Sequence, residues 1–224
     1  MKTLFVTATG TETGKTYVTA ALARALTAKG VAVRALKPVI TGFSPETLDE
    51  SDTAILIRAL GQEVNEAAID ACSPWRFAEP LSPDMAAKRE GREIDFDALL
   101  AFCRDAAQGP EDVLLIEGIG GAMVPLDDTH TVLDWMAELG QPVLIVAGSY
   151  LGTLSHTLSV HLALQTNGIK FAGVVVNESE ESPVPIEETV ETLARFLPGL
   201  NIAAVSRGAK QEVVLQALSE MTGL

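Results

Sequence analysis

The chain has 224 residues, of which 47% are hydrophobic and 5% aromatic, and it carries a net charge of −14. This length supports a sizeable core, and we expect one domain over residues 1–224. The acidic balance argues against nucleic-acid or membrane partners, since both reward clustered lysine and arginine. The two cysteines form no metal or redox motif, and no stretch is long and apolar enough to span a bilayer. We therefore expect a cytoplasmic protein.

Strand-like and helix-like patterns alternate along the whole chain. The apolar runs predict strands at residues 4–6, 31–39, 113–117, 142–146, 171–176 and 202–205. Helical spacing and capping residues predict helices at residues 16–29, 52–60, 84–90, 96–107, 132–139, 153–167, 185–196 and 211–221. Residues 43–50 and 70–83 are expected to be a loop and an irregular segment. Several strands are apolar on both faces, so the pattern predicts an α/β fold whose mostly parallel sheet is flanked by helices on both faces.

A candidate phosphate loop lies between the first strand and the first helix. Residues 8–16 read Ala-Thr-Gly-Thr-Glu-Thr-Gly-Lys-Thr. In this context the loop amides and the helix N-terminus bind phosphate, and the helix dipole adds to the attraction. Lys15 would reach the terminal phosphates, and the Thr16 hydroxyl would ligate Mg²⁺. The usual spacing has a glycine where this chain has Thr9, but the stretch still predicts a P-loop NTPase-type site.

Polar groups at the other strand ends should meet this loop, because ligands of parallel sheets bind beyond the carboxyl ends of the strands. Lys37 would add a second positive charge at a phosphate site. Glu117 follows a buried strand and is a candidate Mg²⁺ ligand. Asp52 is either a second such ligand or an acid that complements a helix dipole. The glycine-rich residues 118–121 could bind a second anion through backbone amides, and the helix N-terminus after Gly152 a carboxylate.

Six short motifs together resemble dethiobiotin synthetase. They are residues 9–16, Lys37-Pro38-Val39 with Thr41-Gly42, Ser51-Asp52, Phe77-Ala78-Glu79-Pro80 with Ser82-Pro83, residues 117–121 with Pro125-Leu126, and Val176-Asn177. The resemblance covers nearly the whole chain in the family's order. The segments around Lys37 and at residues 77–83 carry most of its specificity, since related ATPases share the other motifs.

The resemblance implies an ATP- and Mg²⁺-dependent ring closure in biotin biosynthesis. One amine of 7,8-diaminononanoate takes up CO₂ as a carbamate, and the carbamate attacks the γ-phosphate of ATP. The second amine of the resulting carbamic-phosphoric anhydride closes the ureido ring and expels phosphate. Two lysines suit this chemistry, because carbamate and triphosphate are both anionic.

The family's functional residues map onto this chain position by position. The implied catalytic residues are Lys37, Lys15 and Thr11. The implied nucleotide contacts are Glu12, Thr13, Gly14, Lys15, Thr16, Tyr17, Asp52, Glu117 and Asn177, with Asn177 facing adenine and with Thr16, Asp52 and Glu117 holding Mg²⁺. The implied substrate contacts are Thr41, Gly118, Gly120, Thr153, Leu154 and Ser155. The last three would come from the partner subunit of a homodimer, and Thr41 and Ser155 replace a serine and an asparagine of the family.

Two departures and two alternatives remain at this stage. Ala8 stands where the family has glycine, and residues 203–206 lack a proline-containing segment that helps hold the base, so nucleotide selectivity is not predicted. A partition or division-site ATPase switch is one alternative, although such proteins carry a lysine where this chain has Gly10. A non-catalytic nucleotide-binding relative is the other.

Overall fold

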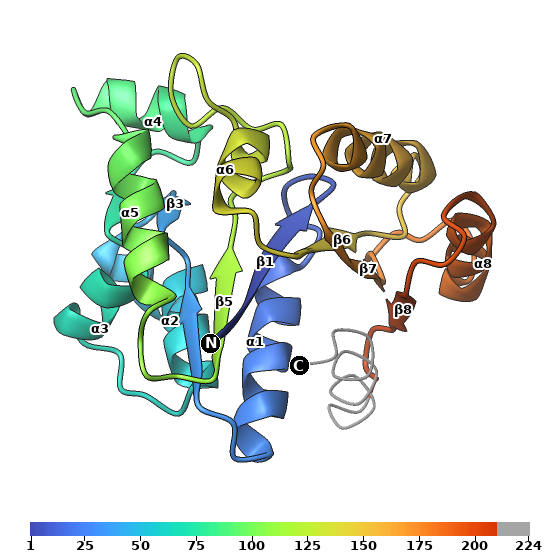
Figure 1. Ribbon diagram of the computed structural model, residues 1–224, viewed down its shortest axis with the longest axis horizontal. Helices are drawn as coiled ribbons and strands as arrows, with labels where there is room; N and C mark the ends of the chain where they lie inside the picture. The colour runs from blue at the N-terminus through green and yellow to red at the C-terminus, as the bar shows by residue number, and fades with distance from the viewer. Residues whose placement is uncertain (210–224) are drawn as a thin grey trace.

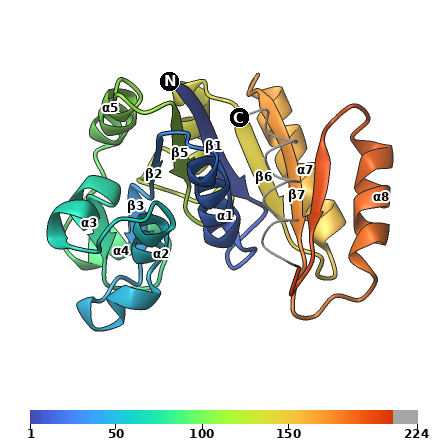
Figure 2. The same cartoon turned by 90° about the horizontal axis from the view of Figure 1, so that it is seen from below.

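The computed structural model describes residues 1–209, and its centre is a sheet of six parallel strands. Figure 2 shows the strands side by side in the order β2-β5-β1-β6-β7-β8. Their bounds are β1 (Lys2–Ala8), β2 (Val33–Leu36), β5 (Val113–Glu117), β6 (Val143–Ala147), β7 (Phe171–Asn177) and β8 (Ile202–Val205). The predicted α/β fold with a parallel sheet is thus confirmed. The helix expected at residues 211–221 lies outside the described residues.

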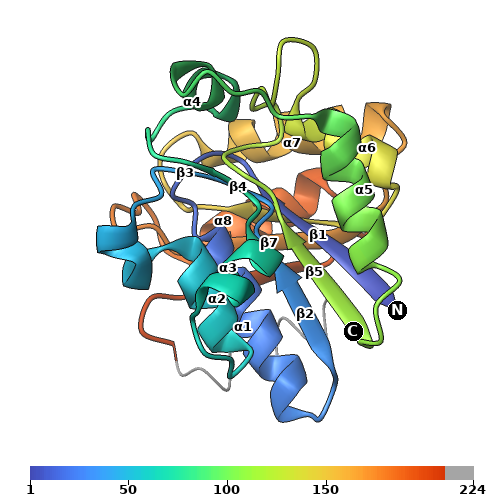
Figure 3. The same cartoon turned by 90° about the vertical axis from the view of Figure 1, so that its left-hand side faces the viewer.

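Helices cover both faces of this sheet. One face packs against α1 (Lys15–Ala28), α2 (Asp52–Ala59) and α3 (Glu66–Cys72). The other packs against α5 (Phe96–Ala106), α6 (Val132–Leu139), α7 (Thr153–Thr166) and α8 (Ile186–Phe196). Helix α4 (Pro83–Arg89) joins the same hydrophobic core but packs on β3 (Val39–Thr41) and β4 (Trp75–Phe77), outside this sheet. Figure 3 shows α1 to α3 and the α5–α6 pair on opposite sides of the strands. Alternate residues of β1 enter the two cores: Leu4 joins the first, and Phe5 meets Trp135 edge to face in the second.

The position of β1 in the sheet explains where the phosphate loop lies. β1 pairs with β5 on one side and with β6 on the other. The strands β2 and β5 lie on one side of β1, and the later strands β6, β7 and β8 lie on the other, so the strand order reverses at β1. Ligands of open parallel sheets bind at such switch points. The loop after β1 lies at the carboxyl ends of the strands, between the ends of β5 and β6 (Figure 1).

The single strand predicted at residues 31–39 is wrong. The chain leaves β5 after Leu36, and β3 (Val39–Thr41) pairs instead with β4 (Trp75–Phe77) in a small separate sheet. The break has a local cause. The Lys37 amide bonds the carbonyl of Cys72, and Pro38 has no amide hydrogen to continue the ladder.

Two other segments are more regular than predicted. The expected loop at residues 43–50 contains a 3₁₀ helix, Pro45–Glu50, whose first turn is capped by Ser44. The expected irregular segment at residues 70–83 contains the end of α3 and all of β4. Among the described residues, no helix has the length and apolar character needed to cross a membrane.

Candidate functional site

The phosphate loop has the backbone conformation of an anion-binding turn. Helix α1 starts directly after Gly14, which has a φ of 90°, and Glu12 also lies in the left-handed region at 60°. A Cβ atom at Gly14 would lie 2.2 Å from Nδ2 of Asn177. That same Nδ2 donates a hydrogen bond to the carbonyl of Thr13 at 3.1 Å. The end of β7 therefore holds the loop in shape, and only glycine fits at position 14.

Lys37 and Glu117 form a buried ion pair beside this loop. Leu36 of β2 pairs in register with Ile116 of β5, so the next residues, Lys37 and Glu117, emerge side by side. Nζ of Lys37 lies 2.7 Å from Oε1 of Glu117, and it also donates to the carbonyl of Gly118 at 2.8 Å. Both side chains are almost fully buried.

Asp52 and Thr16 complete the polar cluster. Oδ2 of Asp52 lies 3.2 Å from Nζ of Lys37, and the hydroxyl of Thr16 donates to Oε1 of Glu117 at 2.7 Å. Asp52 begins α2, whose N-cap Ser51 accepts a hydrogen bond from the amide of Ala54. Asp52 is thus a first-turn acid of α2, and its contact with the cluster also leaves the Mg²⁺-ligand prediction open.

The charges in this cluster shift one another's pKa values. Burial would lower the pKa of Lys37, but Glu117 and then Asp52 outweigh it and raise that pKa above its usual range. Burial would raise the pKa of Asp52, but Lys37 and a hydrogen bond from Thr16 lower it. Burial and the charge of Lys37 lower the pKa of Lys15 to about 8. Lys37 and Asp52 are therefore both held in their charged forms.

The cluster suits a divalent cation that arrives with a nucleotide. Oε1 of Glu117 accepts hydrogen bonds from both Thr16 and Lys37, whereas Oε2 is buried without a hydrogen-bond partner. A buried carboxylate oxygen without a partner is costly unless a ligand completes it. Residues 1–209 contain no cluster of three or more acidic, histidine or cysteine side chains that could hold a metal alone. Few protein ligands are expected for Mg²⁺, which usually keeps water and phosphate oxygens.

A cavity of about 350 Å³ opens above the cluster. It is lined by nine residues predicted individually from the sequence, namely Thr11, Glu12, Gly14, Lys15, Thr16, Lys37, Thr41, Asp52 and Gly120, together with Ile40 and Ile119, which were not predicted individually. Gly118 contributes only its carbonyl, as the acceptor from Lys37. Four segments that are far apart in sequence, residues 11–16, 37–41, 52 and 119–120, therefore line one cavity.

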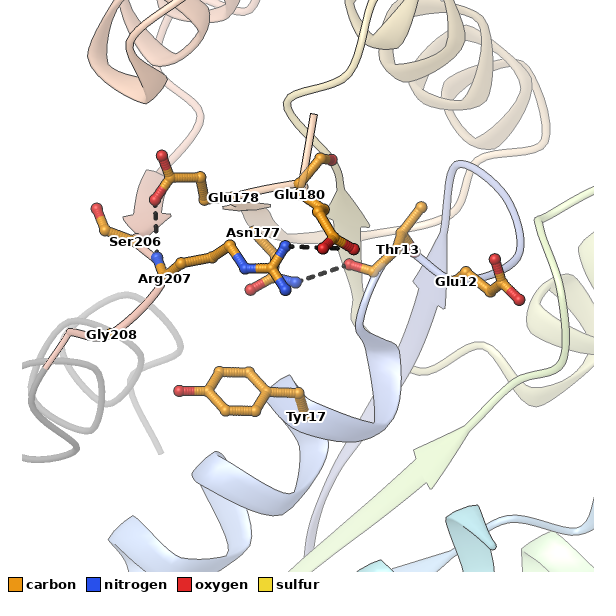
Figure 4. Close-up of a pocket in the computed structure, with 10 residues that line it drawn as sticks. Glu12, Thr13, Tyr17, Asn177, Glu178, Glu180, Ser206, Arg207 and Gly208 are labelled. Carbon is orange, nitrogen blue, oxygen red and sulfur yellow. Dashed lines mark hydrogen bonds and ion pairs between the residues drawn. The ribbon is translucent and has the colours of Figure 1, made fainter. Parts of the chain in front are cut away.

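A second cavity, of about 570 Å³, lies beyond the phosphate loop (Figure 4). Four of the residues predicted to contact the nucleotide line it: Glu12, Thr13, Tyr17 and Asn177. It also includes residues that were not predicted individually: Glu178, Ser179, Glu180, Ser206, Arg207 and Gly208. The backbone N–H of Arg207 donates a hydrogen bond to Oε2 of Glu178 at 2.7 Å, and Nη1 of Arg207 lies 3.9 Å from Oε2 of Glu180. These residues follow the ends of β7 and β8, so the strand-end rule could have found them.

The N-terminus of α7 lies apart from both cavities. Thr153, Leu154 and Ser155 line neither of them. Thr153 is buried and donates to the carbonyl of Gly148 at 2.7 Å, whereas Ser155 is exposed. Tyr150 in the preceding loop bonds His156 at 2.9 Å and lies 3.5 Å from the hydroxyl of Thr9. Within one chain, the three residues predicted to contact the substrate carboxylate therefore lie outside both cavities.

Solved structures with the same arrangement of elements are P-loop ATPases. The MinC:MinD cell division complex of Aquifex aeolicus matches with a TM-score of 0.59 at 12% identity, covering 100% of this chain and 96% of the other. MinD from Pyrococcus horikoshii OT3, solved with Mg-ADP, matches with a TM-score of 0.53 at 17% identity, covering 99% and 89%. At such low identity the likeness shows the fold alone, and it agrees with the predicted parallel sheet flanked by helices.

Sequence relatives are much nearer. A family profile described as an AAA domain matches residues 2–215. The ATP-dependent dethiobiotin synthetase BioD of Acidiphilium cryptum (strain JF-5) is 53% identical over 198 residues, covering 88% of this chain and 89% of the relative. The protein of the same name from Methylobacterium nodulans (strain LMG 21967 / CNCM I-2342 / ORS 2060) is 47% identical over 213 residues, covering 93% and 94%. The chain belongs to the ATP-dependent dethiobiotin synthetase family.

Proposed function

We propose that this chain converts 7,8-diaminononanoate and CO₂ to dethiobiotin in an ATP- and Mg²⁺-dependent reaction. Family membership makes the chain an ATP-dependent ligase that forms C–N bonds. The observation that carries the detailed proposal is the pair of lysines in one cavity. Lys15 lies on the phosphate loop, and Lys37 lies beside Glu117 at the floor of the cavity. Two anionic reactants can be brought together only where positive charge offsets their repulsion.

In the proposed reaction, one substrate amine first adds to CO₂ and loses a proton, giving a carbamate. A carbamate oxygen then attacks the γ-phosphorus of ATP, and ADP leaves. The second amine attacks the carbonyl carbon of the mixed anhydride, and phosphate leaves as the ureido ring closes. Lys15 and Lys37 would stabilise the charge on the transferred phosphoryl group, and Thr11 and Thr41 would orient the reactants.

Thr16, Asp52 and Glu117 would hold Mg²⁺, which when bound would neutralise the β- and γ-phosphate oxygens. The free Oε2 of Glu117 supports this assignment. Oδ1 of Asn177 would accept a hydrogen bond from the adenine amino group, because Nδ2 of Asn177 already donates one to the carbonyl of Thr13. Tyr17, about half exposed at the second cavity, would lie near the base (Figure 4).

The active enzyme would be a homodimer. Thr153, Leu154 and Ser155 start a 14-residue helix whose first turn has no side-chain cap. Exposed amides at such a helix start attract a carboxylate. Since these residues line neither cavity of their own chain, they would meet the carboxylate of a substrate bound mainly to the other subunit.

Product formation tests the proposal directly. Purified protein, Mg-ATP, bicarbonate and 7,8-diaminononanoate should yield dethiobiotin, detected by mass spectrometry. Lys37→Ala should still bind ATP in calorimetry, because the phosphate loop is intact, but should yield no product. Diamine-independent ATP hydrolysis without product in the wild type would contradict the proposal. Normal product from Lys37→Ala would contradict the role given to Lys37.

A further inference from the structure

The ammonium group of Lys37 lies among oxygen atoms of the kind that bind a divalent cation. Nζ lies 2.7 Å from Oε1 of Glu117, 3.2 Å from Oδ2 of Asp52 and 2.8 Å from the carbonyl oxygen of Gly118. Thr16 contacts the same Glu117 oxygen from the other side. Two of these oxygens belong to the carboxylates proposed above as Mg²⁺ ligands. The lysine therefore pairs with both carboxylates of the proposed metal site, and only Oε2 of Glu117 is left without a hydrogen-bond partner.

We propose that Lys37 substitutes for the divalent cation in the metal-free enzyme and leaves the two carboxylates when the cation binds. This inference rests on the metal site of the proposed function. It adds that metal loading itself moves the catalytic ammonium group toward the reacting centre. The lysine then has two positions, one paired with Asp52 and Glu117 and one facing the cavity.

Charge balance supports the position in which Lys37 is paired with Asp52 and Glu117 when no metal is bound. Glu117 is fully buried, and a buried carboxylate without a counter-charge is strongly unfavourable. Lys37, with a side chain only 3% exposed, supplies that counter-charge. The two negative charges of Asp52 and Glu117 then equal the two positive charges of Lys37 and Lys15, so the cluster has no net charge without a metal. A divalent cation close to an unmoved Lys37 would place like charges together in a buried site, where their repulsion is weakly screened.

The surroundings permit the second position. Lys37 lines the 350 Å³ cavity, so its side chain can turn into open space without displacing the core. The bond from Nζ to the carbonyl of Gly118 involves a neutral acceptor that the metal does not require, so it can serve as a pivot. In the second position the ammonium group would approach the γ-phosphate and carbamate oxygens. The lysine would thus reach the reactants only after the metal had loaded.

Metal affinity measured without nucleotide tests this inference. Mn²⁺ binding, followed by electron paramagnetic resonance, should be roughly tenfold tighter in Lys37→Met than in the wild type, because the competing cation is gone. Lys15→Met is the matched control: it removes one positive charge from the same cluster, but Lys15 bonds the carbonyl of Gly10 and neither carboxylate. The control should gain about twofold or less, through the general change in charge.

The outcomes separate the two proposals. Equal gains in the two variants, or no gain in Lys37→Met, would overturn the inference while leaving the metal site intact. If the wild type bound no Mn²⁺ even with ADP, the metal assignment would fail and the inference with it. Should Lys37→Met not fold, a crystal structure of the wild type with Mg-ADP decides. Nζ is expected beyond hydrogen-bond distance of both carboxylates, and an unchanged ion pair would contradict the displacement.

Discussion

At the scale of single residues, the site is organised by the buried pair of Lys37 and Glu117. A glutamate at a strand end and a lysine before a proline were both recognisable in the sequence, but their contact was not. It depends on β2 lying next to β5 with Leu36 opposite Ile116, and no local pattern encodes that pairing. Oε2 of the same glutamate is buried without a hydrogen-bond partner.

We expect Lys15 to make nucleotide binding dependent on pH. Its pKa is lowered to about 8 by burial and by Lys37, and a bound phosphate would raise it again. Binding of ADP should therefore take up protons near that pH, and affinity should fall as the pH rises further. Calorimetry in buffers of different ionisation enthalpy measures the uptake. Lys15→Arg keeps its charge throughout, so it should show no such uptake; equal uptake in both proteins would contradict this account.

Asp52 has a role that a substitution can separate from helix capping. Asp52→Asn keeps the size of the side chain and the Ser51 cap but removes the charge. We expect the Mg²⁺ concentration for half-maximal activity to rise about tenfold, with little change in melting temperature. An unchanged Mg²⁺ requirement would leave Asp52 only its role in the first turn of α2.

At the scale of elements, the phosphate loop is held by its contact with the end of β7. Its existence was predictable, because a glycine-lysine-threonine triplet after a strand has few other uses. The contact between Gly14 and Asn177 was not predictable, since the two residues are far apart in the chain. The break of residues 31–39 into β2 and β3 was missed for a similar reason, since the amide of Lys37 bonds Cys72 at the distant end of α3.

Two glycines of this loop should respond differently to substitution. Gly14→Ala places a Cβ 2.2 Å from the Asn177 amide at a φ of 90°, and should lower the free energy of unfolding by about 1–3 kcal/mol. Gly10→Ala has no atom within 4 Å of its Cβ and should stay within about 0.5 kcal/mol of the wild type. Urea unfolding measures both. Similar losses in the two variants would show that Asn177 does not constrain the loop.

At the scale of the whole molecule, the parallel sheet brings distant strand ends to one edge, and this much followed from the alternation of strands and helices. The placement of α7 did not. Helical spacing puts Leu154, Leu158 and Leu162 on one face of α7, but Leu162 is 61% exposed and α7 buries Thr153, Thr157 and Leu164. A helix whose apolar residues are divided between core and surface cannot be oriented by periodicity alone.

Mixing two inactive variants tests whether the site is shared between subunits. Ser155→Asp should repel the substrate carboxylate, and Lys37→Ala should lack the catalytic lysine. In a mixed dimer, one site would combine an intact Lys37 with an intact α7 from the other chain. Mixtures refolded together should regain up to about a quarter of wild-type activity. If α7 serves its own chain, no activity should return.

In the proposed function, this chain joins CO₂ to a diamine and converts ATP to ADP and phosphate. It is tested most directly by supplying ¹³C-bicarbonate with Mg-ATP and 7,8-diaminononanoate and determining the mass of the product. Dethiobiotin should carry the label in its ureido carbonyl, and ADP should form in equal amount. ADP formed without labelled dethiobiotin would contradict it.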